Sequence, residues 1–279
     1  MKLAVLIVVT MIAFASNSLL NRMAVGAGAI DASGFAVLRV LAGAVTLALL
    51  ARGRIKLFGP GRAIGAVSLG VYMIGFSLAY RTLDAGLGAL ILFGTVQIGM
   101  FGWSTWTGNR PTARQIAGAG VAFTGLVIAL WPGQGAAVGL GSSFLMLLAG
   151  LGWAAYTLNG RGATDPLAET GANFVMCLPL MCLLFFGPAM HANLYGIVLA
   201  IICGAATSGL GYALWYWVLP QVKAQSAAVL QLSVPIIAIA GGALFLGETL
   251  TLAVAIAAAL VVGGIALAVT SGSARAGRK

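Results

Sequence analysis

The chain has 279 residues, of which 61% are apolar and only 7% are charged, with a formal net charge of +10. This composition excludes a water-soluble globular protein and indicates one integral membrane unit. Since the basic residues fall mainly between apolar segments, we attribute the positive charge to membrane topology and expect no nucleic-acid partner.

Ten apolar stretches approach the ~20 residues that a helix needs to cross a ~30 Å hydrocarbon layer. The first five are expected near residues 3–25, 33–51, 63–82, 86–107 and 113–131. The other five are expected near residues 142–160, 170–187, 194–219, 224–246 and 251–270. The sequence therefore predicts an all-α integral membrane protein with ten transmembrane helices.

The start of the first span imitates a cleavable signal peptide, since Lys2 precedes a short apolar run and the triplet Ala13-Phe14-Ala15. Cleavage would remove the counterpart of the span at residues 142–160 and leave the two halves unequal. We therefore expect this segment to be retained as a transmembrane helix.

The second half of the chain reads as a degenerate copy of the first, displaced by 139 positions. Matching positions include Gly70 and Gly209, Ala85 and Ala224, Gly108 and Gly247, Gly125 and Gly264, and the aromatic pair Phe14 and Trp153. Each half has five predicted spans, and an odd number of crossings inserts the copy upside down. We expect two inverted five-helix repeats, residues 1–139 and residues 140–279, the second ending in a short basic tail.

Basic residues also predict the orientation, because cytoplasmic loops collect Lys and Arg. With the N-terminus inside, 12 of the 15 Lys and Arg residues fall in cytoplasmic segments, against Arg22 and Arg81 outside and Arg39 within a span. Both chain ends are therefore expected in the cytoplasm.

No organised catalytic or metal-binding pattern is present in the sequence. Cys177, Cys182 and Cys203 show no CxxC spacing, and His191 falls in an outer loop without acidic or cysteine neighbours. Nucleophile-elbow, zinc-protease and phosphate-loop motifs are also absent. We expect a protein that is not an enzyme and that uses no metal or cofactor.

Polar and aromatic residues near mid-bilayer are the candidates for substrate binding, because polar groups at that depth face the bundle or a wet cavity more often than lipid. The candidates are Asn17, Tyr72, Gln97, Trp153, Tyr156, Thr207, Ser208, Tyr212 and Gln231. The aromatic members either wall a cavity suited to aromatic or large apolar amino acids, or fill helix interfaces.

Arg39 and Pro235 are unusual residues for the interior of a span. A cation costs at least ~2.5–3.5 kcal/mol at the centre of a membrane helix. Arg39 therefore either snorkels or pairs with backbone carbonyls, or it binds a substrate carboxylate. Pro235 cannot donate to the carbonyl of Gln231, so it should bend the ninth span. The bend is either a kink supported by hydroxyls such as that of Ser233, or a hinge that also contacts substrate.

All five acidic residues, Asp31, Asp84, Asp165, Glu169 and Glu248, lie in predicted loops or at helix ends. Proton-coupled carriers usually keep a titratable group inside the bundle, so we expect facilitative transport. Glu248 and Thr249 precede the last span and should favour its positive N-terminal end.

Small residues at Gly118 and Ala122, and at Ala259 and Gly263, have the four-residue spacing that lets membrane helices pack closely. Such spacing serves either a seam within one chain or a homodimer. The sequence leaves monomer and homodimer open.

Three features carry a family resemblance: the run Phe14-Ala15-Ser16-Asn17, Arg39, and Pro235 followed by Leu-Gly-Glu at residues 246–248. With them the chain resembles the drug/metabolite transporter superfamily, in particular its ten-helix EamA-type members and the aromatic amino-acid exporters among them. The first half departs from the pattern, because Val96 and Asn109 occupy the positions that match Pro235 and Glu248.

The resemblance implies export of small metabolites, often amino acids, across the bacterial inner membrane. We expect alternating access around a central uncharged cavity, with aromatic or large apolar amino acids as substrates. Two alternatives stay open. One is a broad exporter of drugs or lipophilic cations, which would need a carboxylate in the cavity, and the other is a non-transporting scaffold or pore.

Overall fold

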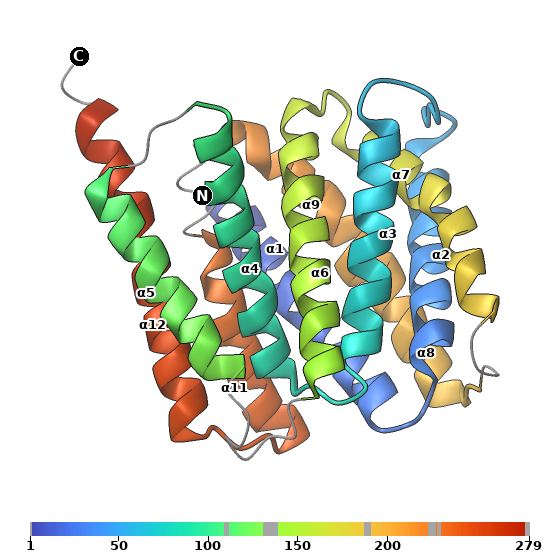
Figure 1. The fold of residues 1–279 in the computed structure, drawn as a ribbon. Coiled ribbons are helices and arrows are strands. Elements are labelled where there is room, and N and C mark those ends of the chain that lie inside the picture. Colours follow the sequence, from blue (N-terminus) through green and yellow to red (C-terminus); the bar gives the residue numbers. More distant parts are fainter. Residues whose placement is uncertain are drawn as a thin grey trace.

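The computed structural model describes residues 2–108, 112–130, 139–186, 191–222, 227 and 230–276, and these residues are mostly helical (Figure 1). Within these ranges there is no strand, only an isolated bridge between Ile30 and Ala192. The expected all-α class is confirmed.

The helices of the first half are α1 (Lys2–Asn21), α2 (Ala32–Ala51), α3 (Arg62–Ala79), α4 (Ala85–Trp106) and α5 (Ala113–Leu130). Those of the second half are α6 (Leu140–Asn159), α7 (Pro166–Met181), α8 (Leu194–Ile202), α9 (Gly211–Val218), α11 (Ser233–Leu246) and α12 (Leu252–Ala276). A π-helical turn, η1 (Arg22–Gly26), extends α1, and a longer one, η4 (Cys203–Leu210), joins α8 to α9. Short 3-10 turns follow α6, α7 and α9 as η2 (Gly160–Gly162), η3 (Cys182–Phe186) and η5 (Leu219–Gln221).

Side-chain caps fix the starts of several helices. Asp31 accepts a hydrogen bond from the Gly34 amide at 2.8 Å and so caps α2. Asp165 caps α7, where Pro166 occupies the first turn, and Asn193 caps α8. Such residues satisfy backbone donors that have no partner within the helix.

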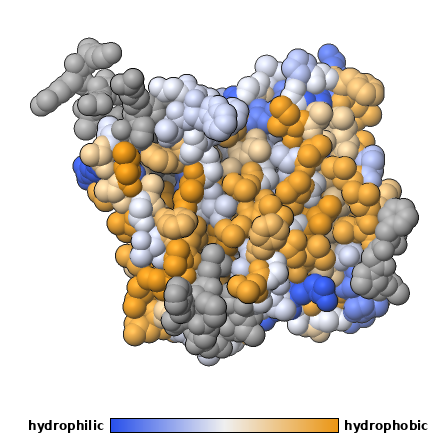
Figure 2. Space-filling view, viewed as in Figure 1, coloured by the Kyte–Doolittle hydropathy of each residue, from blue (hydrophilic) through white to orange (hydrophobic). Residues whose placement is uncertain are grey.

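Seven helical spans among the described residues are long and apolar enough to cross a membrane. Three shorter apolar helices, Ala113–Ala129, Ser233–Leu246 and Leu252–Ala268, fall on the fifth, ninth and tenth predicted spans. Figure 2 shows apolar residues over the middle of one face and hydrophilic residues gathered toward its ends, as a lipid-exposed surface requires. The protein is thus a multi-pass membrane protein, while the count of ten stays a prediction because part of residues 224–246 lies outside the described residues.

The two halves of the chain interleave in space (Figure 1). α3 and α4 both pack against α6, and in the same way α9 and α11 both pack against α1. α2 lies against α7, α4 against α11, and α5 against α12. Each helix therefore packs against helices of the other half in the paired manner that an inverted repeat would produce.

The start of α1 and the end of α12 lie at the same end of the bundle (Figure 1). We call this the terminal end, and the opposite end, where η1 begins and α11 finishes, the distal end.

The seam between α5 and α12 depends on glycine. A Cβ atom at Gly118 would lie 2.5 Å from the carbonyl oxygen of Gly264, and one at Gly264 would lie 2.5 Å from the Ala122 amide. The pair Gly118 and Ala122 therefore packs within one chain, as small residues do where membrane helices approach closely. A Cβ atom added at Gly263, by contrast, would meet no atom of the neighbouring described helices within 4 Å.

The ninth predicted span is interrupted a few residues before Pro235. α11 begins at Ser233, after a turn at Leu232, and Pro235 is buried near its start. The Ser233 hydroxyl donates to the carbonyl oxygen of Leu230 at 2.7 Å. The break is thus supported by a nearby hydroxyl, which is how proline is tolerated in membrane helices.

Candidate substrate site

Arg39 of α2 is fully buried at the centre of the bundle. Its Nε donates to the Ser208 hydroxyl at 2.7 Å. Its Nη2 lies 3.1 Å from Asn17 Oδ1, 3.1 Å from the Tyr72 hydroxyl and 2.8 Å from the Tyr212 hydroxyl. Its Nη1 has no hydrogen-bond partner among the described residues. Arg39 therefore neither snorkels to the interface nor pairs with backbone carbonyls, and it keeps one donor free.

The guanidinium group also lies over two aromatic rings. Its Cζ is 4.9 Å from the ring centroid of Phe76 and 5.4 Å from that of Tyr72. Cation–π contacts of this kind partly replace lost hydration, but they supply no counter-charge.

Close backbone packing positions Arg39. A Cβ atom at Gly204 of η4 would collide with the backbone carbonyl of Arg39, and one at Gly43 would lie 2.9 Å from the Gly204 carbonyl oxygen. α2 and η4 can therefore touch only because both positions are glycine. The π-helical geometry of η4 then places Ser208 at the Arg39 Nε, and such π turns are frequent at functional sites.

Asn17 holds α1 against η4. Its Oδ1 accepts from the hydroxyls of Thr207 and Ser208, both at 2.8 Å, and from the Cys203 thiol at 3.3 Å, besides Arg39. Asn17 is therefore fully engaged as an acceptor and fixes the geometry of its neighbours.

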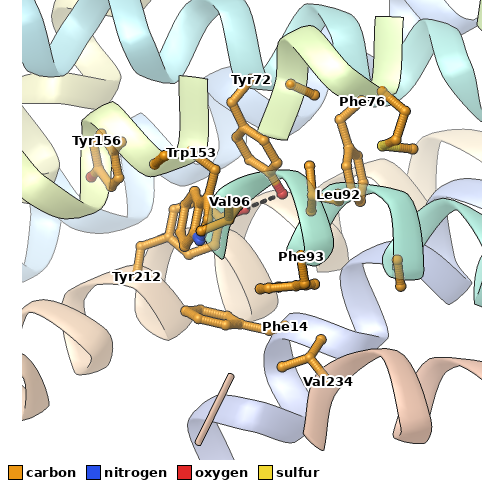
Figure 3. Close-up of a cluster of buried hydrophobic side chains, with 14 of the residues drawn as sticks. Phe14, Tyr72, Phe76, Leu92, Phe93, Val96, Trp153, Tyr156, Tyr212 and Val234 are labelled. Carbon is orange, nitrogen blue, oxygen red and sulfur yellow. Dashed lines mark hydrogen bonds between the residues drawn. The ribbon is translucent and has the colours of Figure 1, made fainter. Parts of the chain in front are cut away.

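Trp153 of α6 is the hub of an aromatic cluster (Figure 3). Its ring centroid lies 4.6 Å from that of Tyr212, 5.0 Å from Tyr72, 5.3 Å from Phe14 and 5.4 Å from Tyr156, on which it stacks. The dashed line marks the 2.8 Å hydrogen bond that the Tyr212 hydroxyl donates to that of Tyr72. All four aromatic residues predicted from the sequence thus come together.

The two glutamines differ in their relation to this cluster. Gln231 is buried, and its Oε1 accepts from Trp153 Nε1 at 3.3 Å, whereas its Nε2 has no partner among the described residues. Gln97 is buried on α4 but does not line the central cavity. Gln231 thus contacts Trp153, and neither glutamine is among the residues that line the cavity.

A small cavity lies at this cluster, with Asn17, Tyr72, Trp153 and Tyr212 in its wall, and it is nearly closed in this conformation. Its volume is about 10 Å³, and Phe14, Phe76, Leu92 and Phe93 complete its wall. One water molecule needs ~10–15 Å³, so a metabolite can enter only after the bundle opens.

Sequence reasoning missed Phe76 and Phe93 as wall residues. Phe76 follows Tyr72 by four positions, and Phe93 precedes Gln97 by four, so each shares a helix face with a residue already chosen. Phe14 was noted in the sequence as the repeat counterpart of Trp153 and in the family motif, but not as a wall residue, and the rings of Phe14 and Trp153 meet edge to face.

The expectation that Glu248 serves the last helix is wrong. Glu248 Oε1 accepts from the Ala85 amide at 2.7 Å and Oε2 from the Gly86 amide at 3.3 Å, so Glu248 caps α4. The start of α12 is capped by Thr251, whose Oγ1 accepts from the Val254 amide at 3.2 Å. The sequence pattern could not reveal this, because the partner of Glu248 is about half the chain away.

The acidic residues form ion pairs with arginines or accept hydrogen bonds from backbone amides at the two ends of the bundle. At the distal end, Arg22 lies 3.2 Å from Asp84 and 3.6 Å from Glu248. At the terminal end the pairs are Arg54 with Asp165, at 2.6 Å, and Arg62 with Glu169, at 3.6 Å. Asp31 accepts from the amides of Gly34 and His191. All five acids lie within the described ranges, and none of them pairs with Arg39.

A closed bundle of apolar helices around a buried cation and an aromatic cluster is typical of a membrane carrier. Residues 140–270 match the EamA-like transporter family. The chain is similar to an uncharacterized protein of Pseudomonas aeruginosa, with 44% identity over 98% of this chain and 96% of that protein. It is also 25% identical to an uncharacterized transporter of Archaeoglobus fulgidus, over 74% of this chain and 76% of that protein.

The fold also matches a solved crystal structure with a TM-score of 0.64, over 93% of this chain and 97% of that one, at 18% identity. At this identity the likeness shows the fold alone. The sequence matches establish the family: the chain belongs to the EamA-like transporter family of the drug/metabolite transporter superfamily.

Proposed function

We propose that the protein exports small carboxylate-bearing metabolites across the bacterial inner membrane, above all amino acids with aromatic or large apolar side chains. The observation that carries the proposal is Arg39, a buried cation with no acidic partner and a free Nη1 donor. Arginine is suited to carboxylates because its planar fork can donate two parallel hydrogen bonds. In this proposal the substrate carboxylate supplies the charge that Arg39 lacks.

The aromatic cluster would recognise the rest of the substrate. Tyr72 and Tyr212 reach Arg39 through their hydroxyls, while their rings adjoin Trp153 and Tyr156. Aromatic side chains gain ~0.5–1.5 kcal/mol from such contacts beyond simple burial. A ligand with a carboxylate at one end and an aromatic group at the other matches this arrangement.

Transport would proceed by alternating access, with residues 1–139 and 140–279 acting as inverted repeats around the site. The paired helix contacts support this division, as does the contact between Phe14 and its repeat counterpart Trp153. Pro235, beside the break at Leu232, would serve as a hinge of the ninth span. The nearly closed cavity corresponds to the occluded stage of the cycle.

The carrier would be facilitative, with both chain ends in the cytoplasm. The acids that a proton-coupled carrier would use at the centre all lie at the bundle ends. A pH gradient should therefore not drive concentrative uptake into vesicles that contain the protein. The cycle needs only the substrate and the lipid bilayer, and it can run in a monomer or a homodimer.

The test is counterflow in proteoliposomes over a panel of labelled phenylalanine, tryptophan, leucine, choline and glucose 6-phosphate. We expect saturable counterflow of the amino acids, fastest for the aromatic ones, and background rates for choline and the sugar phosphate. Transport of choline alone would indicate a cation exporter, and non-saturable leakage of every solute would indicate a pore. Either result contradicts the proposal.

A further inference from the structure

We propose that the same site also carries aromatic carboxylates that lack an ammonium group, such as aromatic 2-oxo and 2-hydroxy acids, and that it binds them more tightly than the matching amino acids. The inference rests on the proposed function, because it uses the same cavity and the same transport cycle.

The first argument is the net charge of the site. Among the residues that the structure describes, Arg39 is the only charged one in the site, and the five acids of the chain are engaged at the two ends of the bundle. A carboxylate without an ammonium group neutralises Arg39 completely. A zwitterionic amino acid leaves the buried site with a net positive charge, and its ammonium group is repelled by the guanidinium a few ångströms away.

The second argument is the scarcity of free acceptors for an ammonium group. Asn17 Oδ1 already accepts from four donors, the Tyr72 hydroxyl accepts from Arg39 and Tyr212, and Gln231 Oε1 accepts from Trp153. An ammonium group donates only, so beside the guanidinium it would compete for acceptors that already serve the protein.

Aromatic faces offer an ammonium group little more. The rings of Tyr72 and Phe76 already lie under the Arg39 guanidinium, and one face of Trp153 is stacked on Tyr156. Cation–π stabilisation, which could otherwise replace an acceptor, is therefore largely used within the protein.

Free hydrogen-bond donors, by contrast, remain beside the guanidinium. Arg39 Nη1 is free, and the Tyr72 hydroxyl accepts from Arg39 and Tyr212, so its own hydrogen is available to a ligand, whereas the hydroxyl hydrogens of Tyr212 and Ser208 are already donated within the protein. A 2-oxo group accepts hydrogen bonds, and a 2-hydroxy group both donates and accepts, so either fits this surround better than an ammonium group does.

The experiment compares four solutes that share a phenyl ring and a short side chain: phenylpyruvate, phenyllactate, phenylalanine and phenethylamine. Half-saturation concentrations are measured by counterflow in proteoliposomes of the full chain, with protein-free liposomes as the leak control. We expect half-saturation for phenylpyruvate and phenyllactate at concentrations at least about tenfold below that for phenylalanine, a factor that one well-placed charge interaction can supply. Phenethylamine should give only background transport.

Two variants separate the role of Arg39 from general damage. In Arg39→Gln the preference for the oxo and hydroxy acids over phenylalanine should vanish. Arg81→Gln, which removes an exposed arginine at the distal end, should keep the wild-type preference. If phenylalanine is carried as well as or better than phenylpyruvate, this inference is overturned and the proposed function stands. If none of the carboxylates is carried, both are overturned.

Discussion

At the two ends of the bundle each acidic residue is paired with an arginine or with backbone amides, whereas at the centre Arg39 has only neutral partners. Paired charges at the ends stabilise this closed conformation. An unpaired charge at the centre costs stability, since burial removes its hydration and no anion replaces it. The contrast supports the proposal that the ends stabilise the conformation while the centre binds a ligand.

The two ends also differ from each other. At the distal end one arginine joins η1 to the start of α4 and to Glu248, and the side chains are mostly buried, with 23% exposure for Arg22 and 12% for Glu248. At the terminal end the Arg54–Asp165 pair is exposed, at 55% and 37%. Because screening by water weakens exposed pairs, the distal contacts should contribute more to closure.

The largest effect is expected for Arg39→Gln, which removes the central charge. The kcat/KM for phenylalanine counterflow should fall at least about 100-fold, as expected from the loss of a charge-assisted contact made by the substrate. The melting temperature in detergent should stay within a few degrees of the wild type, because an unpaired buried charge adds little stability. Arg81→Gln is the control, and an equal loss of activity there would contradict the central role of Arg39.

A smaller effect is expected for Tyr72→Phe, which removes the hydroxyl that contacts Arg39 and Tyr212 but keeps the ring. Loss of a hydrogen bond of this kind corresponds to about a 5- to 10-fold rise in half-saturation concentration. Tyr195→Phe is the matched control, because Tyr195 is 51% exposed on α8. Equal effects in the two variants would argue against a role for the Tyr72 hydroxyl in the site.

At the distal end the expected effect is on stability. Burial raises the pKa of the Glu248 carboxyl above its ordinary value, as does nearby Asp84, while hydrogen bonds from Ala85 and Gly86 and the charge of Arg22 act in the opposite direction. The folded protein therefore holds this proton at higher pH than the unfolded chain does. Stability should fall as the pH rises from the ordinary carboxyl pKa to the raised one, and then level off.

Thermal unfolding of the wild type and Glu248→Gln, measured as a function of pH, checks this expectation. The variant should lose that part of the pH dependence. On the alkaline side of the window it should be at least as stable as the wild type, because a neutral amide avoids the cost of burying a carboxylate. An unchanged pH profile in the variant would show that Glu248 does not titrate in this way.

The smallest effect is expected for Arg54→Ala at the terminal end. An exposed pair contributes only ~0.2–1 kcal/mol, so the melting temperature should shift by no more than a few degrees. Arg52→Ala, which removes an exposed neighbour for which no ion pair is found in the described part of the chain, is the control. A loss of more than a few degrees would show that this exposed pair contributes more than its exposure allows, and it would contradict the ranking of the two ends.

Much of this arrangement could be predicted from the sequence, because it depends on composition and on local pattern. A cation in an apolar span is expected to face the bundle, which singles out Arg39, and proline in a span removes a backbone hydrogen bond, which draws attention to Pro235. The aromatic residues could be chosen by depth alone. The depth of each residue follows from the span boundaries, so no tertiary information was needed.

The partners of these residues could not be predicted. Ser208 meets Arg39 because η4 is π-helical and because Gly43 and Gly204 let two backbones touch. Glu248 caps α4 because the end of α11 lies beside the start of α4. The position of Glu248 in the sequence, just before α12, suggested instead that it would cap α12. Both contacts depend on how distant helices pack, and a single sequence carries no direct signal for that.

The central proposal is that Arg39 binds the carboxylate of the substrate. The most direct test removes the substrate carboxylate and the Arg39 charge, separately and together. Counterflow of phenylalanine and of phenylalanine amide, which lacks the carboxylate, is measured in the wild type and in Arg39→Gln. We expect the wild type to prefer phenylalanine over phenylalanine amide by at least about 100-fold in kcat/KM. The variant should distinguish the two solutes by less than about 3-fold, because two groups that interact show coupled effects when each is removed. An equal preference in both proteins would contradict the account.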